Sequence, residues 1–238
     1  MFSDYFIFSL DDIRTFLVNA GMRAIPVLIC ITFHELSHGF IAYRLGDRTA
    51  KDMGRLTLNP VKHVDVVGLL MLLFVGFGWA KPVPVNMHNF KRPKWYMAIT
   101  AIAGPVSNIV LAVFVLLIYG LVITPLGGTF ILHGNMLLLQ TSGAGGIILN
   151  MVHYTAVISI ALAVFNLMPI PPLDGSKVIF SLLSEKTYFK LMRYERYGML
   201  LLVVFLTTQF FRDTIGLLTG TILRNLDVIW QTVYIAVN

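Results

Sequence analysis

The residues best suited to chemistry form a short run at positions 34–38, His34-Glu-Leu-Ser-His38, inside a long apolar stretch. On a helix, residues i and i+4 lie on one face, so both imidazoles can reach the same ion. Zinc accepts neutral imidazole nitrogens, and a catalytic zinc site keeps one position for water. Glu35 is placed to take a proton from that water. Ionisable side chains are costly inside an apolar span, which favours this functional interpretation over two histidines that merely bond neighbouring helices.

A zinc site needs a third protein ligand, and the chain offers few. Asp174 is the one acidic residue in the stretch 66–184. It follows a proline-rich run, 166–173, that cannot continue a helix, so the backbone can bring this carboxylate back against a neighbour. The alternative role for Asp174 is to cap the helix that follows it. The competing ligands are His63, in a basic loop, and His153, near the outer end of its span.

The elements that must position these residues are membrane spans. The chain has 238 residues, 57% hydrophobic and 13% charged, whereas a soluble domain carries about 25% charged residues. Runs of at least about 18 apolar residues are typical of spans. Four segments could cross a bilayer: 22–43, 96–123, 147–168 and 197–218. Arg212 and Asp213 interrupt the last, which could instead be a short span of about 15 residues that ends at Phe211. We therefore expect an all-α polytopic membrane protein with about four to six transmembrane helices.

The basic residues predict the orientation of these spans. Lys and Arg gather in segments 44–64, 81–94 and 171–196, and none lies in the loop 124–146. By the positive-inside rule, the three basic segments share the cytoplasmic side. The apolar run 66–80 begins and ends on that side, so we expect it to re-enter near the active site, with a short β-hairpin as one form. Irregular backbone at membrane depth needs protein or water around it, which predicts a cavity there.

One membrane-embedded domain should occupy residues 1–238. We expect an amphipathic N-terminal segment over 1–21, a catalytic core over 22–185 and C-terminal helices over 186–238. The net charge of +6 is explained by the orientation of the spans, so it does not indicate nucleic acid binding. The expected surroundings are instead the lipid bilayer and a protein substrate, and the sequence contains no indication of oligomeric state.

Five motifs, taken in order, resemble the site-2 proteases, a family of intramembrane zinc metalloproteases. They are His34-Glu-Leu-Ser-His38-Gly39, Gly54-Arg-Leu-Thr-Leu-Asn59-Pro60-Val-Lys62-His63, Lys81-Pro-Val-Pro-Val-Asn86, Gly104-Pro105-Val-Ser-Asn108, and the run from Asn166 to Gly175. The resemblance covers roughly residues 22–185 and is closest to small prokaryotic members that lack an inserted peptide-binding domain.

The resemblance implies one zinc ion bound by His34, His38 and Asp174, with Glu35 activating water. It also implies cleavage of a peptide bond within or next to a transmembrane segment, the reaction of regulated intramembrane proteolysis. The protein would then lie in a prokaryotic cell membrane, with its active site toward the cytoplasmic side.

A neutral hydrogen-bond donor near the metal would stabilise the oxyanion of such a reaction. Asn108 is one candidate, because it follows Gly104-Pro105, a pair that can kink a helix and allow close packing. The family resemblance also implies that Asn108 faces the site. Asn166 is the second candidate. The alternative is that either amide only bonds a backbone carbonyl beside a proline.

Residues 82–86 have a pattern suited to holding an extended substrate. Pro82 and Pro84 remove donors from one edge of a strand, while Val83 and Val85 keep theirs on the other. Such a strand could pair with a substrate that must unwind before it is cut. The alternative is a loop stiffened by its prolines.

Two other functions would use the same ligands: a membrane metal transporter and a non-proteolytic membrane adaptor. A transporter usually shows polar residues along a path through the membrane and often internal repeats. Here the outer halves of the spans are nearly bare of polar residues, and no repeat is visible. The complete set of His34, Glu35, His38 and Asp174 counts against an adaptor.

Overall fold

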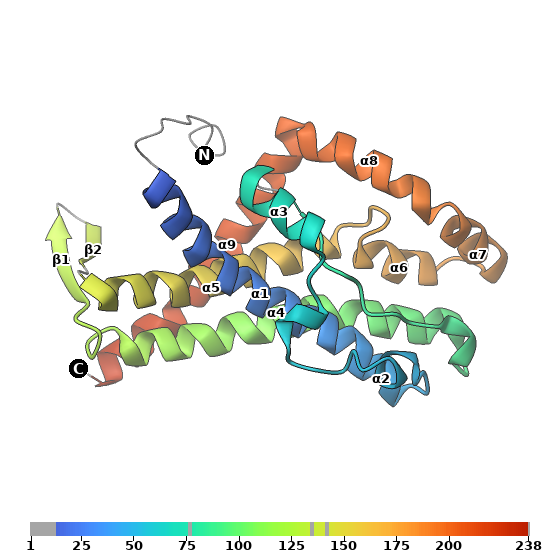
Figure 1. The fold of residues 1–238 in the computed structure, drawn as a ribbon, viewed down its shortest axis with the longest axis horizontal. Coiled ribbons are helices and arrows are strands. Elements are labelled where there is room, and N and C mark those ends of the chain that lie inside the picture. The colour runs from blue at the N-terminus through green and yellow to red at the C-terminus, as the bar shows by residue number, and fades with distance from the viewer. Residues whose placement is uncertain (1–12, 76–77, 134–135, 141–142, 238) are drawn as a thin grey trace.

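The computed structural model describes residues 13–75, 78–133, 136–140 and 143–237. Three long helices form its centre (Figure 1): α1 (Ile13–Arg44), α4 (Pro93–Val122) and α5 (Gly143–Leu167). Each contains a stretch long and apolar enough to cross a membrane, because about 20 helical residues match a hydrocarbon layer about 30 Å thick. The first three predicted spans are therefore confirmed, and the protein is a predominantly helical membrane protein.

The predicted N-terminal segment 1–21 falls largely on residues 1–12, which lie outside the described residues. From Ile13 onward the chain is already part of α1, which continues without a break through the first span. The division into an N-terminal segment, a core and C-terminal helices stays a prediction.

The fourth predicted span, 197–218, is not one straight helix. It divides into α8 (Glu195–Thr207) and α9 (Gln209–Val237), which meet at an angle of 83°. Thr208 has extended backbone at the break, and its hydroxyl accepts a hydrogen bond from Phe211 N at 3.2 Å. Arg212 donates to the Thr207 carbonyl at 2.9 Å, so both helix ends are satisfied where they separate.

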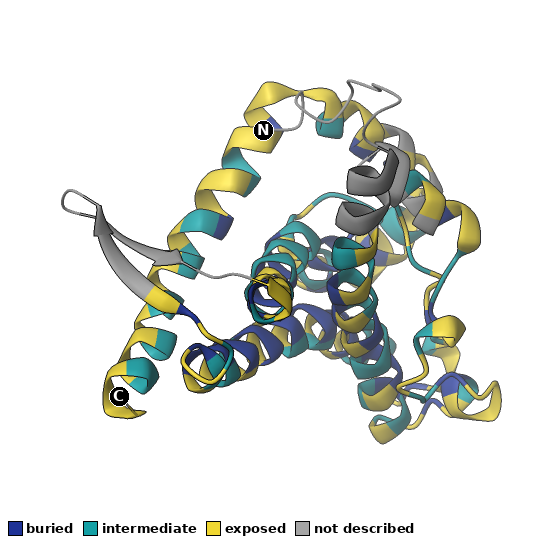
Figure 2. Ribbon diagram, turned by 60° about the vertical axis from the view of Figure 1, so that its left-hand side comes forward, coloured by how far each residue is buried: buried dark blue, intermediate teal, exposed yellow. Residues whose placement is uncertain are grey.

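The core lies where α4 packs against α1, α5 and α9. Small residues such as Ala112 and Ala156 are fully buried there, next to Leu116 and Ile160, which are also fully buried. Figure 2 shows the buried residues gathered where the central helices meet. The outward faces carry exposed apolar side chains, for example Val110, at 62% exposure. Apolar outward faces of this kind are what a lipid environment stabilises.

The apolar run 66–80 does begin and end at one place. Val64 pairs with Ala80 in an antiparallel β-bridge, and Lys81 N donates to the His63 carbonyl at 2.9 Å. Between them lies α3 (Val66–Val75), whose 10 residues are too few to cross a bilayer. The segment 66–80 therefore leaves and returns at the same place, as a re-entrant segment would, and we call it the closed loop. In place of the expected β-hairpin, the described residues near the site contain this single β-bridge.

A two-stranded hairpin occurs elsewhere in the described residues. Strand β1 (Thr129–His133) pairs with β2 (Met136–Gln140) in the loop between α4 and α5. It lies at the opposite end of the molecule from α6 (Asp174–Ser181) and α7 (Glu185–Arg193), as Figure 1 shows. Three short helices complete the described elements: α2 (Thr49–Asp52), η3 (Pro60–Lys62) and η4 (Met87–Asn89).

Candidate metal centre

Helix α1 brings two imidazoles together in the buried centre of the bundle. His34 and His38 lie one turn apart, as the i,i+4 spacing predicts, and their Nε2 atoms are 3.1 Å apart. Their side chains are buried, with residue exposures of 5% and 9%. Two ring nitrogens therefore face the same point.

Asp174 reaches this point because α5 stops. The helix ends at Leu167, two residues before Pro169, and the chain turns back so that α6 begins at Asp174. Gly175 sits against the carbonyls of Leu167 and Met168, where any Cβ would collide with the backbone. The N-cap of α6 is Leu173, and the Asp174 carboxylate points to the histidines instead. The capping alternative is therefore wrong.

The three donor atoms form a compact triangle. Asp174 Oδ2 lies 3.2 Å from His34 Nε2 and 3.0 Å from His38 Nε2, which closes the triangle with the 3.1 Å separation of the two nitrogens. Ligands bound about 2.0–2.1 Å from a tetrahedral zinc ion lie about 3.3 Å from one another. His34, His38 and Asp174 thus form a possible metal site whose donor types and spacing fit zinc.

The surroundings hold His38 ready for a metal. Its Nδ1 donates to the Thr100 carbonyl of α4 at 2.8 Å, so the lone pair of its Nε2 faces the triangle. Gly104, one turn further along α4, passes directly over both rings. A Cβ on Gly104 would lie 2.5 Å from His38 Nε2 and 2.6 Å from His34 Cε1. Only glycine lets α4 approach this closely.

The charge at Asp174 also suits a ligand. Burial alone would raise the pKa of its carboxyl, but its polar and charged neighbours, Lys177 among them, lower it below its usual value. Lys177 Nζ lies 3.7 Å from Oδ1, the oxygen that faces away from the histidines. The group is therefore held in the ionised form that binds a metal.

Glu35 lies beside the triangle without being part of it. Its Oε2 accepts a hydrogen bond from the backbone N–H of Val83 at 2.8 Å. The Val83 side chain is buried against Gly39, where an added Cβ would lie 2.9 Å from Val83 Cγ1. Residues 82–86, the predicted substrate strand, therefore lie next to Glu35. Of the two N–H groups expected to bind substrate, that of Val83 is already bonded inside the protein, which leaves that of Val85.

A cavity of about 680 Å³ opens onto the triangle and Glu35. One wall is the closed loop, through residues such as Gly68 and Trp79, which agrees with the cavity predicted beside a re-entrant segment. The opposite walls are apolar and come from α5 and α8, for example Phe165 and Leu202. A polar reaction centre thus adjoins space lined by hydrocarbon.

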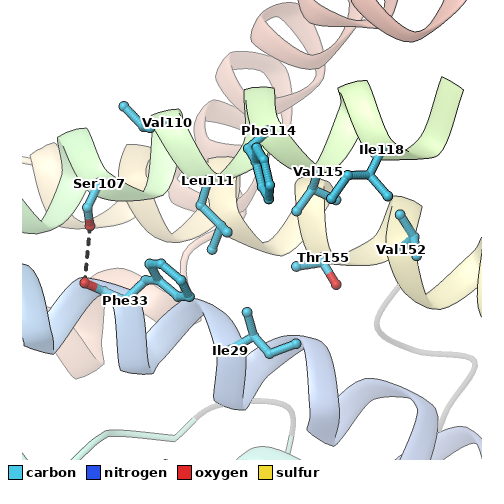
Figure 3. A pocket seen from close by; sticks show the side chains of 10 residues that line it. All are labelled: Ile29, Phe33, Ser107, Val110, Leu111, Phe114, Val115, Ile118, Val152 and Thr155. Atoms are coloured by element: carbon cyan, nitrogen blue, oxygen red, sulfur yellow. Dashed lines mark hydrogen bonds between the residues drawn. The ribbon is translucent and has the colours of Figure 1, made fainter. Parts of the chain in front are cut away.

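A second hollow, on the α1–α4–α5 face, has a different character. Figure 3 shows this groove of about 540 Å³, where Phe33 and Phe114 are among the apolar side chains that line it. Its two polar side chains are Thr155 and Ser107, whose hydroxyl donates to the Phe33 carbonyl at 3.3 Å. No ionisable residue is among the described residues that line it, so the chemistry belongs to the first cavity.

The two competing ligands are bonded to other groups. His63 is fully buried but donates through Nε2 to the Thr57 carbonyl at 2.8 Å. His153 packs on Tyr119 and lies 4.0 Å from Asp227, in the α4–α5–α9 region. Neither belongs to the triangle.

The two predicted amides differ. Asn166 donates to the Leu162 carbonyl at 2.9 Å, which is the backbone role given above as its alternative. Asn108 is fully buried, and its Nδ2 has no hydrogen-bond partner among the described residues. It lies one turn beyond Gly104, on the same face of α4, although it is not among the residues that line the cavity.

Comparison with known proteins gives the family. Residues 22–208 match the model of Peptidase family M50. The chain belongs to this family. The resemblance to site-2 proteases is thereby confirmed, and this M50 chain is a metallopeptidase with zinc as its cofactor.

Curated relatives agree with this assignment. The chain is 40% identical over 190 residues to "Putative zinc metalloprotease YwhC" of Bacillus subtilis (strain 168), covering 77% of this chain and 79% of the relative. It is 30% identical over 185 residues to "Putative zinc metalloprotease Rip2" of Mycolicibacterium smegmatis (strain ATCC 700084 / mc(2)155), covering 76% of this chain and 64% of that protein. No solved structure matches the chain.

Gly104→Ala should lower zinc affinity by at least about tenfold, the effect typical of disturbed surroundings at a metal site. The new Cβ must displace one imidazole from the triangle. Chelator competition on purified protein measures this. Gly220→Ala is the matched control, because a Cβ there meets nothing within 4 Å. Equal zinc affinity in both variants would contradict the close packing of α4 on the ligands.

Proposed function

We propose that this M50 peptidase is an intramembrane zinc endopeptidase that hydrolyses peptide bonds within or next to transmembrane segments, as in regulated intramembrane proteolysis. The observation that carries the proposal is the donor triangle of His34, His38 and Asp174, which shares one cavity with Glu35 inside a bundle of apolar helices. A metal and a base are the two components with which a metallopeptidase hydrolyses an unactivated amide.

Zinc held by His34, His38 and Asp174 would act as a Lewis acid that polarises the scissile carbonyl and makes water acidic enough to attack it. Glu35 would accept the proton of the attacking water. With Oε2 bonded to Val83 N, its Oε1 is the oxygen available for that proton. Glu35 would then transfer the proton to the leaving amine.

Asn108 is proposed to stabilise the oxyanion that forms on the scissile carbonyl. Its unpartnered Nδ2 is a buried donor on the face of α4 that Gly104 turns toward the histidines. Leaving a buried donor without a partner costs about 1–3 kcal/mol, which is recovered if charge develops within its reach.

The substrate is expected to be a transmembrane or membrane-proximal protein, and lipid is the other partner. The apolar walls of the cavity suit a hydrophobic segment that has unwound near the metal. The clamping hypothesis for residues 82–86 continues in a narrower form. Val85 keeps the one N–H on that edge for which no internal hydrogen bond is described, so pairing with substrate would centre on it.

We further propose that the active site faces the cytoplasm of a prokaryotic cell. The basic segments 44–64, 81–94 and 171–196 lie toward the end of the molecule that carries α2, α6 and α7, away from the hairpin (Figure 1). Under the positive-inside rule, that end is cytoplasmic.

Glu35→Gln should abolish cleavage of a transmembrane substrate while zinc remains stoichiometric. Removing a general base costs about 10²–10⁴-fold in rate, and the amide cannot take a proton. Detergent-purified protein would be tested for zinc content and for turnover, with Glu185→Gln, at the start of α7, as the control. Full activity of Glu35→Gln would contradict the proposal. Bound zinc without turnover in the wild type would instead favour a metal transporter or an adaptor.

Asn108→Ala should lower kcat by about 10²-fold, the cost of removing one oxyanion donor, with zinc content and KM nearly unchanged. Asn166→Ala is the matched control, since its amide already bonds a carbonyl of its own helix. Steady-state kinetics on one peptide substrate would separate the two. If both variants lose the same activity, or if Asn108→Ala loses zinc in proportion, Asn108 has a packing role instead.

A further inference from the structure

We infer that Asp47 and Arg55 are positioning residues that hold the segment 81–89 in the one register that presents Val83 N–H to Glu35. The inference rests on the proposed role of Glu35 as the base. Neither residue touches the donor triangle. They flank α2, the short helix that follows α1, and α1 carries Glu35 itself.

Asp47 anchors the far end of the segment. Asp47 is fully buried, and its carboxylate accepts hydrogen bonds from Asn86 N and Asn89 Nδ2, both at 2.7 Å. Thr49 donates two more, from its backbone N–H and its hydroxyl. Every partner is therefore a donor. Burial alone would raise the pKa of the Asp47 carboxyl, but the bonds from Thr49, Asn89 and Asn86 lower it below its usual value.

Arg55 anchors the near end. Its guanidinium Nη2 donates to the carbonyls of Lys81 and Pro82, at 2.8 Å and 3.2 Å, and the residue is only 7% exposed. Lys81 N–H is itself bonded to the His63 carbonyl. Because one charged NH₂ group holds two successive carbonyls, the chain has little freedom to slide.

The prolines make the register decisive. Val83 lies between Pro82 and Pro84, neither of which has an N–H. A slip of one residue in either direction would place a proline nitrogen opposite Glu35 and delete the hydrogen bond. The anchors on both sides of Val83 therefore determine whether the base has its partner.

A correctly held Glu35 matters for rate more than for binding. The Val83 bond holds Oε2 and so limits how the Glu35 carboxylate can turn. A misplacement of about 1 Å at a reacting group can cost about 10²-fold in rate. Loss of the anchors should therefore lower kcat, leaving zinc and substrate affinity nearly unchanged.

The test is Asp47→Asn in full-length, detergent-purified protein. Asparagine keeps the shape but turns an NH₂ group toward partners that are all donors, so at least one bond of the anchor must break. Asp52→Asn is the matched control, because Asp52 is an exposed partner of Arg48 at 3.8 Å. At the other anchor, Arg55→Gln is the test variant, and Arg48→Gln is its control because Arg48 is the exposed partner of Asp52.

Hydrogen exchange of the Val83 amide is the readout that does not depend on cleavage. Its neighbours in sequence are prolines without amide hydrogens, which isolates its signal. Glu35→Ala sets the exchange rate of an unbonded Val83 amide. We expect Asp47→Asn to raise exchange at Val83 at least tenfold and to lower kcat by about 10–100-fold, with KM and zinc content within about twofold of wild type.

Unchanged exchange at Val83 in both anchor variants would overturn the inference. So would raised exchange with wild-type kcat, because the register would then not matter for the reaction. A fall in kcat that follows a fall in zinc content would assign the anchors to the metal site and also overturn it. Absence of cleavage in the wild type would refute the proposed peptidase function instead, and the exchange measurements would still decide whether Asp47 and Arg55 hold the segment.

Discussion

Two imidazole nitrogens and a carboxylate oxygen approach to 3.0–3.2 Å in the buried interior of this protein. All three present lone pairs to one point, and a divalent cation is the partner that makes such an arrangement favourable. Much of the local structure follows from this requirement. Helix α4 must carry glycine at position 104, and α5 must end at Leu167 so that the chain can return Asp174.

The polar contacts around the triangle lie toward one end of an otherwise apolar bundle. The Thr100 carbonyl sets the tautomer of His38, and the Val83 N–H holds Glu35. The segment that supplies Val83 is held in turn by the loop after α1. Helix α1 and the segment that follows it therefore carry two of the three donor residues, Glu35, and the side chains that hold residues 81–89, so a displacement of one part would move the others. On the α1–α4–α5 face, the apolar groove of Figure 3 contains no comparable chemistry in the described residues.

The donor triangle could be predicted from sequence because the signals of its residues are local or exclusive. The spacing of His34 and His38 places them on one helix face whatever the tertiary structure, and Asp174 has almost no acidic rivals. Arg212 and Asp213 do mark an interruption of the fourth span in the sequence, but the position of the break at Thr208 depends on capping by Thr208 and Arg212, which hydropathy does not predict. Nor could the Val83–Glu35 bond, which depends on how residues 48 positions apart meet. Gly104-Pro105 did signal close packing, but only the fold identifies the histidines as the neighbours.

The most direct test of this account is zinc K-edge X-ray absorption on the purified protein. One zinc per chain should show an inner shell of nitrogen and oxygen at about 2.0–2.2 Å, with the outer-shell scattering of two imidazoles. Asp174→Ala should alter that shell and leave the two-imidazole signal in whatever zinc is retained. A sulfur ligand, a third imidazole, or a shell unchanged by Asp174→Ala would contradict the assignment of His34, His38 and Asp174 as the metal ligands.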